Sequence, residues 1–166
     1  MSHIFDTNTF SEAHKLYYPL DVVVSYWRWV EEAAREGHIA SIERVRDELT
    51  AGDPNGGRYP LARWALDMPS AFWLPLGSTG TTHLREIAGW ANQPERIYST
   101  QAVSGFMGST DLFLVAQCIE VGATLVTREV SDPACKRRVK IPDVCLAFGV
   151  ECIDPFTAYR RLGMRF

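Results

Sequence analysis

Short apolar runs alternate along the chain with segments in which apolar residues recur at every third or fourth position. Four of these runs have the length and composition of buried strands: 3–5, 38–42, 123–127 and 150–153. The helical spacing predicts helices in five places: 21–36, 43–49, 60–67, 81–91 and 111–121. Strands that alternate with helices predict a three-layer α/β/α fold with a mainly parallel central sheet.

The segments between these elements are assigned by their polar and turn-forming residues. We expect Ser41 to cap the helix that starts at Glu43, and Gly122 to end the helix before the strand at 123–127. The aromatic residues between Tyr17 and Trp29 suit either core packing or base stacking, and their helical spacing favours the core. Segment 71–76 is expected to be irregular or a short strand, and 141–145 to start a last helix or a turn. The remaining segments are expected to be connections or flexible, polar stretches: 17–19, 51–58, 105–109 and 128–140.

Size and charge narrow the possible functions. The 166 residues are enough for one domain, 1–166, with its own core. The formal net charge is -3 and the pI is about 5.8, so nucleic acid must be bound by local basic patches or through a cation rather than by bulk charge. We expect the four cysteines to be free thiols in a reducing cytosol. The chain shows neither a signal peptide nor an apolar run long enough for a membrane span, which predicts a soluble, cytoplasmic protein.

Four acidic residues occupy positions that suit a catalytic centre. Asp6 and Glu129 each follow a predicted strand, Asp111 opens a helix, and Glu48 lies on the helix after the second strand. In parallel sheets, sites form beyond the carboxyl ends of the strands. Clustered carboxylates repel one another unless a divalent cation such as Mg²⁺ or Mn²⁺ neutralises them. A metal-bound water attacks phosphate esters, so the cluster predicts phosphodiester hydrolysis.

Each acid also has a purely structural interpretation. Asp6 suits a turn cap with Asn8, and Asp111 suits the first turn of any helix because the helix dipole favours negative charge there. Glu48 suits a solvated helix face, and Glu129 suits a loop surface. Three neighbouring acids compete for the last two roles: Glu43 and Asp47 with Glu48, and Asp132 with Glu129.

Four sequence segments together resemble the PIN-domain ribonucleases, the family of the VapC-like toxins. They are Ile4-Phe5-Asp6-Thr7-Asn8, Val45-x-x-Glu48-Leu49, Thr110-Asp111 with the apolar residues after it, and Gly122-Ala123-Thr124-Leu125-Val126-Thr127-Arg128-Glu129. The resemblance extends from about residue 3 to residue 156. It implies a PIN-like fold, dependence on Mg²⁺ or Mn²⁺, and endoribonuclease activity.

The resemblance also implies roles for individual residues. Asp6, Glu48, Asp111 and Glu129 become the catalytic, metal-binding set, and Asn8 and Thr110 orient carboxylates or waters. Asp132 shares or takes over the fourth role, since the family more often has aspartate where this chain has Glu129. Family toxins are usually neutralised by a small antitoxin protein and often form homodimers, so both partners are expected here.

Basic residues flank two of the four acids. Six of them are candidates for neutralising RNA phosphates: Arg44, Arg46, Lys136, Arg137, Arg138 and Lys140. A solvated surface is the alternative interpretation of each group. Any sequence preference is expected to come from single-stranded or looped RNA.

Two other functions compete with metal-dependent RNA cleavage. One is a catalytically silent PIN fold that only binds RNA or a protein. The presence of an acid at all four positions argues against this alternative. The other is a phosphatase with an aspartyl nucleophile. That enzyme requires a second aspartate two residues after the first, and Asn8 stands there.

Overall fold

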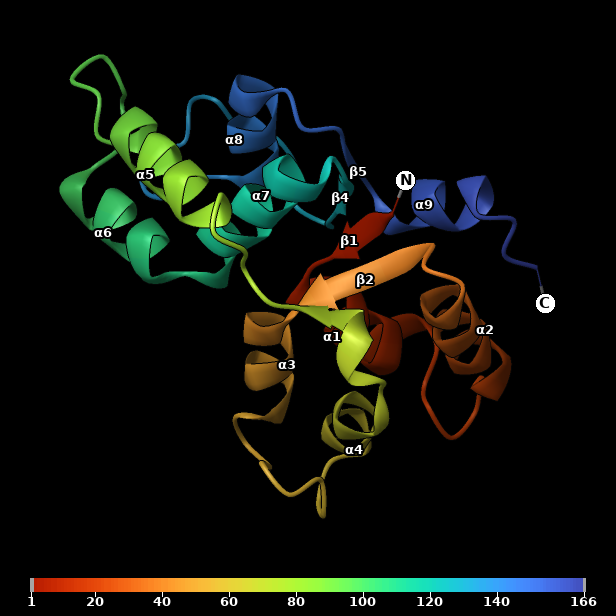
Figure 1. Cartoon of the computed structure of the whole chain (residues 1–166). Coiled ribbons are helices and arrows are strands. Elements are labelled where there is room, and N and C mark those ends of the chain that lie inside the picture. The colour runs from red at the N-terminus through yellow and green to blue at the C-terminus, as the bar shows by residue number, and fades with distance from the viewer. Residues whose placement is uncertain (1, 166) are drawn as a thin grey trace.

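A computed structural model describes residues 2–165 (Figure 1), in which five parallel strands form one sheet in the order β3-β2-β1-β4-β5. The strands are β1 (His3–Phe5), β2 (Ile39–Ile42), β3 (Trp73–Leu74), β4 (Thr124–Val126) and β5 (Cys152–Ile153). The sheet is parallel throughout, and Figure 1 shows helices on both sides of it. The predicted α/β class is therefore confirmed.

Nine α-helices are described within residues 2–165. They are α1 (Thr7–Glu12), α2 (Val24–Arg35), α3 (Glu43–Thr50), α4 (Pro60–Asp67), α5 (Gly80–Ala91), α6 (Thr100–Gly108), α7 (Thr110–Val121), α8 (Ile141–Phe148) and α9 (Pro155–Arg161). A π-helical segment, Ala13–Tyr17, continues α1, and a 3₁₀ turn, Ser70–Phe72, precedes β3. The five helices predicted by apolar spacing all form, within a few residues of their expected ends.

Two local predictions are wrong. Ser41 does not cap α3, because it lies inside the fully buried strand β2, where its hydroxyl donates to the carbonyl oxygen of Phe5 at 2.7 Å. The stretch 105–109 is not a flexible connection, since most of it forms the end of α6. That helix is capped at its start by the Ser99 side chain, which accepts from the Ala102 N–H.

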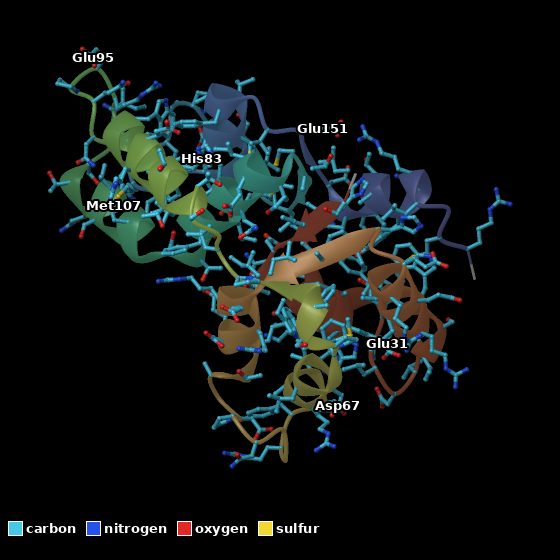
Figure 2. All side chains as sticks on the ribbon, in the orientation of Figure 1. Glu31, Asp67, His83, Glu95, Met107 and Glu151 are labelled. Carbon is cyan, nitrogen blue, oxygen red and sulfur yellow. The ribbon has the colours of Figure 1, made fainter. Side chains whose placement is uncertain are left out.

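Aromatic side chains fill the core beneath α2 and α4. Tyr26 and Trp27 are buried, and the Trp27 and Trp64 rings lie 4.8 Å apart between centroids. The Tyr26 and Tyr159 hydroxyls form a hydrogen bond of 2.8 Å. Core packing of the Tyr26–Trp27 pair is therefore confirmed, whereas Tyr17 remains exposed. Charged residues such as Asp67 and Glu95 lie on the outer surface instead (Figure 2).

The register of the two central strands positions the candidate site. Phe5 of β1 pairs with Val126 of β4, so the residues that follow them, Asp6 and Thr127, leave the sheet side by side. Gly122 precedes β4, and its left-handed conformation (φ 64°) ends α7 and turns the chain toward the strand. The predicted polar residues therefore gather at the carboxyl edge of the sheet.

Two further features concern the cysteines and the apolar helices. All four cysteines are free, with Cys118 and Cys145 buried. Within residues 2–165, no single helix is long and apolar enough to cross a membrane. Only α6 and α7 together meet that test, as a pair bent by 63°.

Candidate functional site

Asp6 is the most buried acid at the edge of the sheet. One carboxylate oxygen accepts from the backbone N–H and the hydroxyl of Thr9, at 2.7 and 2.6 Å, and so caps α1. The other oxygen accepts from the Thr127 hydroxyl at 2.6 Å. Burial raises the pKa of Asp6, the hydrogen bonds from Thr127 and Thr9 oppose this rise, and the charge of Glu129 adds to it. The capping role and the place in the acidic cluster therefore coexist in one residue.

Asp111 lies in the first turn of α7, where the other predicted acids act on it. Burial and then the charge of Glu129 raise the pKa of Asp111 from 3.8 to about 6. This value also includes the guanidinium of Arg138, which lowers the pKa, and the smaller contributions of Asp6 and Glu48, which raise it. The structure thus brings the four predicted acids within electrostatic range of one another.

Glu48 links three helices through two threonine hydroxyls. Thr110, at the start of α7, donates to one carboxylate oxygen of Glu48 at 2.6 Å. Thr7, in the first turn of α1, donates to the other oxygen. Glu48 is the acid of α3 that contacts α1 and α7 in this way, and its charge is among those that raise the pKa of Asp111.

Glu129 is held between the loop after β4 and the start of α8. Its side chain is only 8% exposed, and one oxygen, Oε2, accepts from the Ile141 N–H at 2.9 Å. The other oxygen, Oε1, is buried and lies 2.5 Å from Nη2 of Arg138, but it accepts no hydrogen bond of favourable geometry. The same nitrogen of Arg138 lies 3.6 Å from Oδ2 of Asp111.

The chemistry of these groups fits a divalent cation. All four are carboxylates, which are the donors that Mg²⁺ and Mn²⁺ prefer, and the buried Oε1 of Glu129 has the guanidinium of Arg138 nearby but no well-aligned hydrogen bond. Among residues 2–165, however, no three His, Cys, Asp or Glu side chains converge closely enough to form a ready metal site. Arg138 lies between Asp111 and Glu129, two of the acids that must converge to bind a metal.

Two open hollows meet this acidic cluster. The larger, of about 590 Å³, is lined by Asn8, Glu12, Arg128, Glu129, Val130, Ser131, Asp132, Arg138 and Lys140. The smaller, of about 230 Å³, reaches Asp111 and is lined in part by Arg137 and Arg138. Three of the predicted phosphate-binding residues, Arg137, Arg138 and Lys140, therefore face a hollow beside the acids.

The other predicted site residues lie elsewhere or make other contacts. Arg44 stacks on Phe113 at 3.5 Å in a separate hollow, and Arg46 pairs with Asp47 at 3.7 Å. Lys136 is exposed, and its backbone carbonyl accepts from the Ser99 N–H.

Asn8 and Asp132 border the larger hollow without joining the acidic cluster. Within the described residues Asn8 is exposed and makes no hydrogen bond to the four acids. The side chain of Asp132 accepts from the Ala134 N–H at 3.2 Å within its own loop. Glu129, and not Asp132, is the acid beside Asp111.

Comparison with protein families identifies the chain. Residues 3–166 match the family model described as "Domain of unknown function (DUF4411)". The chain belongs to the DUF4411 family. A comparison with curated protein sequences gave no match to this DUF4411 protein.

One solved structure shares the fold of this DUF4411 protein. It is a chain from the crystal structure of VapBC2 from Rickettsia felis bound to a DNA fragment from their promoter. The match has a TM-score of 0.53 and 22% sequence identity, and it covers 79% of the DUF4411 chain and 90% of the other chain. The predicted PIN-like α/β/α fold is therefore confirmed.

Sequence reasoning named Thr110, which donates to Glu48, but missed three other hydroxyl groups that hold the carboxylates of the DUF4411 site: those of Thr7, Thr9 and Thr127. Thr7 and Thr9 follow Asp6 directly, and Thr127 precedes Glu129 by two residues. The spacing of three residues between Asp6 and Thr9 is the usual spacing of a helix cap, and this signal was available in the sequence. Nothing in the local sequence indicated that Thr127 donates to Asp6, 121 residues away.

Proposed function

We propose that this protein is a metal-dependent endoribonuclease that hydrolyses RNA phosphodiester bonds, with Mg²⁺ or Mn²⁺ held by Asp6, Glu48, Asp111 and Glu129. The observation that carries this proposal is the meeting of carboxylates from four segments at one edge of the sheet, where the largely buried Glu129 and Asp111 share one nitrogen of Arg138 as their counter-charge. A buried carboxylate oxygen next to a second carboxylate is costly unless a cation compensates it. The resemblance of all four acidic segments to PIN domains supports the same assignment.

The chain's own residues prepare the site for this chemistry. A bound divalent cation supplies a more acidic water and stabilises negative charge on the phosphate. Thr9 and Thr127 fix the carboxylate of Asp6, and Thr110 fixes that of Glu48, so little reorganisation is required of these two acids. Arg128 and Lys140 line the larger hollow and are placed to neutralise phosphates next to the cleaved bond.

A role as the toxin of a toxin–antitoxin pair deepens this proposal. It is supported by the fold shared with a chain of the VapBC2 complex and by the sequence resemblance to VapC-like toxins. A small antitoxin that covers the acidic edge is the expected partner, and a homodimer is expected by the same resemblance. Co-expression with the product of a neighbouring small gene tests this role, since the antitoxin should co-purify and suppress RNA cleavage.

The direct test is incubation of the purified protein with single-stranded RNA, with and without Mn²⁺. We expect cleavage that requires the metal and that falls by about 100-fold or more in Asp6→Asn and Asp111→Asn, because each change removes a metal-binding charge. Asp53→Asn is the matched control, since Asp53 is a buried aspartate held by the loop at 51–59 and outside the cluster.

Two outcomes would replace this proposal with one of its competitors. Intact RNA in the presence of Mn²⁺ would favour a silent PIN fold that only binds. Hydrolysis of a small phosphomonoester with RNA left intact would favour a phosphatase.

A further inference from the structure

Arg138 bridges two acids that come from different parts of the fold. Glu129 follows β4, and Asp111 lies on α7, yet a single guanidinium nitrogen lies 2.5 Å from one carboxylate and 3.6 Å from the other. Arg138 is also the cation that lowers the pKa of Asp111 within this cluster. It therefore acts on the two acids as a positive counter-charge.

The contact between Arg138 and Glu129 is close but poorly aligned. Oε2 of Glu129 is fixed by the N–H of Ile141, so the side chain is anchored and its other oxygen, Oε1, faces Arg138. Oε1 is buried and accepts no hydrogen bond of favourable geometry, even though the guanidinium is adjacent. Charge compensation without good hydrogen-bond geometry is what a spherical cation supplies better than a planar guanidinium.

The position of Arg138 also divides the site. Its side chain lines both the larger hollow beside Glu129 and the smaller hollow beside Asp111. More than half of this side chain, 54%, is exposed, so it can leave the acids without disrupting the core. Arginine does not lose its charge at any physiological pH, so a divalent cation can take its place only if the side chain moves away.

We propose that Arg138 is a built-in counter-ion, which occupies the cation's position between Glu129 and Asp111 and competes with the divalent metal for both acids. This inference rests on the proposed function, since it assumes that these acids bind a metal. Arg138 then keeps the metal-free protein stable at the cost of metal affinity. The metal-bound state requires the displacement of Arg138 from the two acids.

The test is the affinity for Mn²⁺, measured by isothermal titration calorimetry on the full chain without RNA. Arg138→Gln and Arg138→Ala both remove the charge, and we expect Mn²⁺ to bind each about fivefold more tightly than the parent, the scale of a half-exposed ion pair. Arg138→Lys keeps the charge and is expected to bind like the parent. Arg137→Gln is the control, because this substitution removes the same charge from a residue that lines the smaller hollow together with Arg138.

Thermal melting provides a second readout of the same competition. With the metal chelated, Arg138→Gln should melt below the parent, and Mn²⁺ should raise its melting temperature by more than it raises that of the parent. If the parent binds Mn²⁺ clearly and both neutral variants bind it no more tightly than the parent, the counter-ion role of Arg138 is overturned and the proposed function stands. An absence of Mn²⁺ binding in parent and variants alike would overturn both.

Discussion

The loop at residues 51–59 and the acidic edge of the sheet both bury an aspartate, but they treat its charge in opposite ways. Asp53 accepts three backbone N–H groups, from Gly57, Arg58 and Tyr59, at 3.1, 2.6 and 2.8 Å. The hydrogen bonds from Tyr59 and Arg58 lower the pKa of Asp53. At the edge of the sheet, burial and neighbouring carboxylates raise the pKa of Asp111 to about 6.

The difference lies in the groups that surround each carboxylate. The carboxylate of Asp53 accepts three N–H groups of its own loop, so its charge stabilises the conformation of that loop. Glu120 behaves in the same way, because Thr79, Gly77 and Gly80 donate to it and lower its pKa. At the sheet edge Asp6 is likewise held by three hydrogen bonds, but the charges of Glu129, Asp6 and Glu48 all act on Asp111, which leaves negative charge for an external cation.

The largest expected effect is a pH dependence of stability that arises from Asp111. The folded-state pKa of Asp111 lies above its unfolded value, so ionisation of Asp111 opposes folding. The free energy of unfolding of the metal-free protein should therefore fall as the pH rises from about 4 to about 7, by roughly 3 kcal/mol from this group.

Urea denaturation in EDTA across this pH range measures the effect of Asp111. In Asp111→Asn the fall should be much shallower, and near pH 7 the variant should be more stable than the parent. Parallel pH profiles for variant and parent would show that Asp111 is not destabilised by its neighbours.

The next effect concerns Asp53, in the loop at residues 51–59. Asp53→Ala removes the acceptor of three N–H groups, so the melting temperature should fall by several degrees while Mn²⁺-dependent RNA cleavage is retained. Differential scanning fluorimetry measures the change, with Asp47→Ala as the control because Asp47 is an exposed acid of α3. Loss of cleavage at temperatures where Asp53→Ala is folded would contradict the separation of the two regions.

The smallest effect concerns the hydroxyl that connects two of the clustered acids. The Thr127 hydroxyl donates to Asp6 at 2.6 Å and accepts from the Glu129 N–H at 3.1 Å. Thr127→Val should lower the free energy of unfolding by about 1 kcal/mol, whereas Thr127→Ser, which keeps the hydroxyl, should lie near the parent. Chemical denaturation of both variants in EDTA checks this, and equal stability of the valine and serine variants would count against the bond.

Short helices were harder to predict than strands or long helices. Helices α1 and α9, of six and seven residues, were not predicted, because they span too few turns to show an apolar period. Each is instead fixed at its start by an aspartate, Asp6 or Asp154, whose side chain accepts from backbone N–H groups of the first turn.

The sequence alone determined the fold class, the central strands and the placement of acids at strand ends and helix starts. Apolar runs and their spacing report which residues must leave water, and a parallel sheet necessarily gathers the carboxyl ends of its strands. Only the tertiary structure decided which partners those acids have. Thr110 reaches Glu48 across 62 residues, and Arg138 reaches Asp111 from the loop after β4. Such pairings depend on how distant segments pack against each other, which local periodicity does not encode.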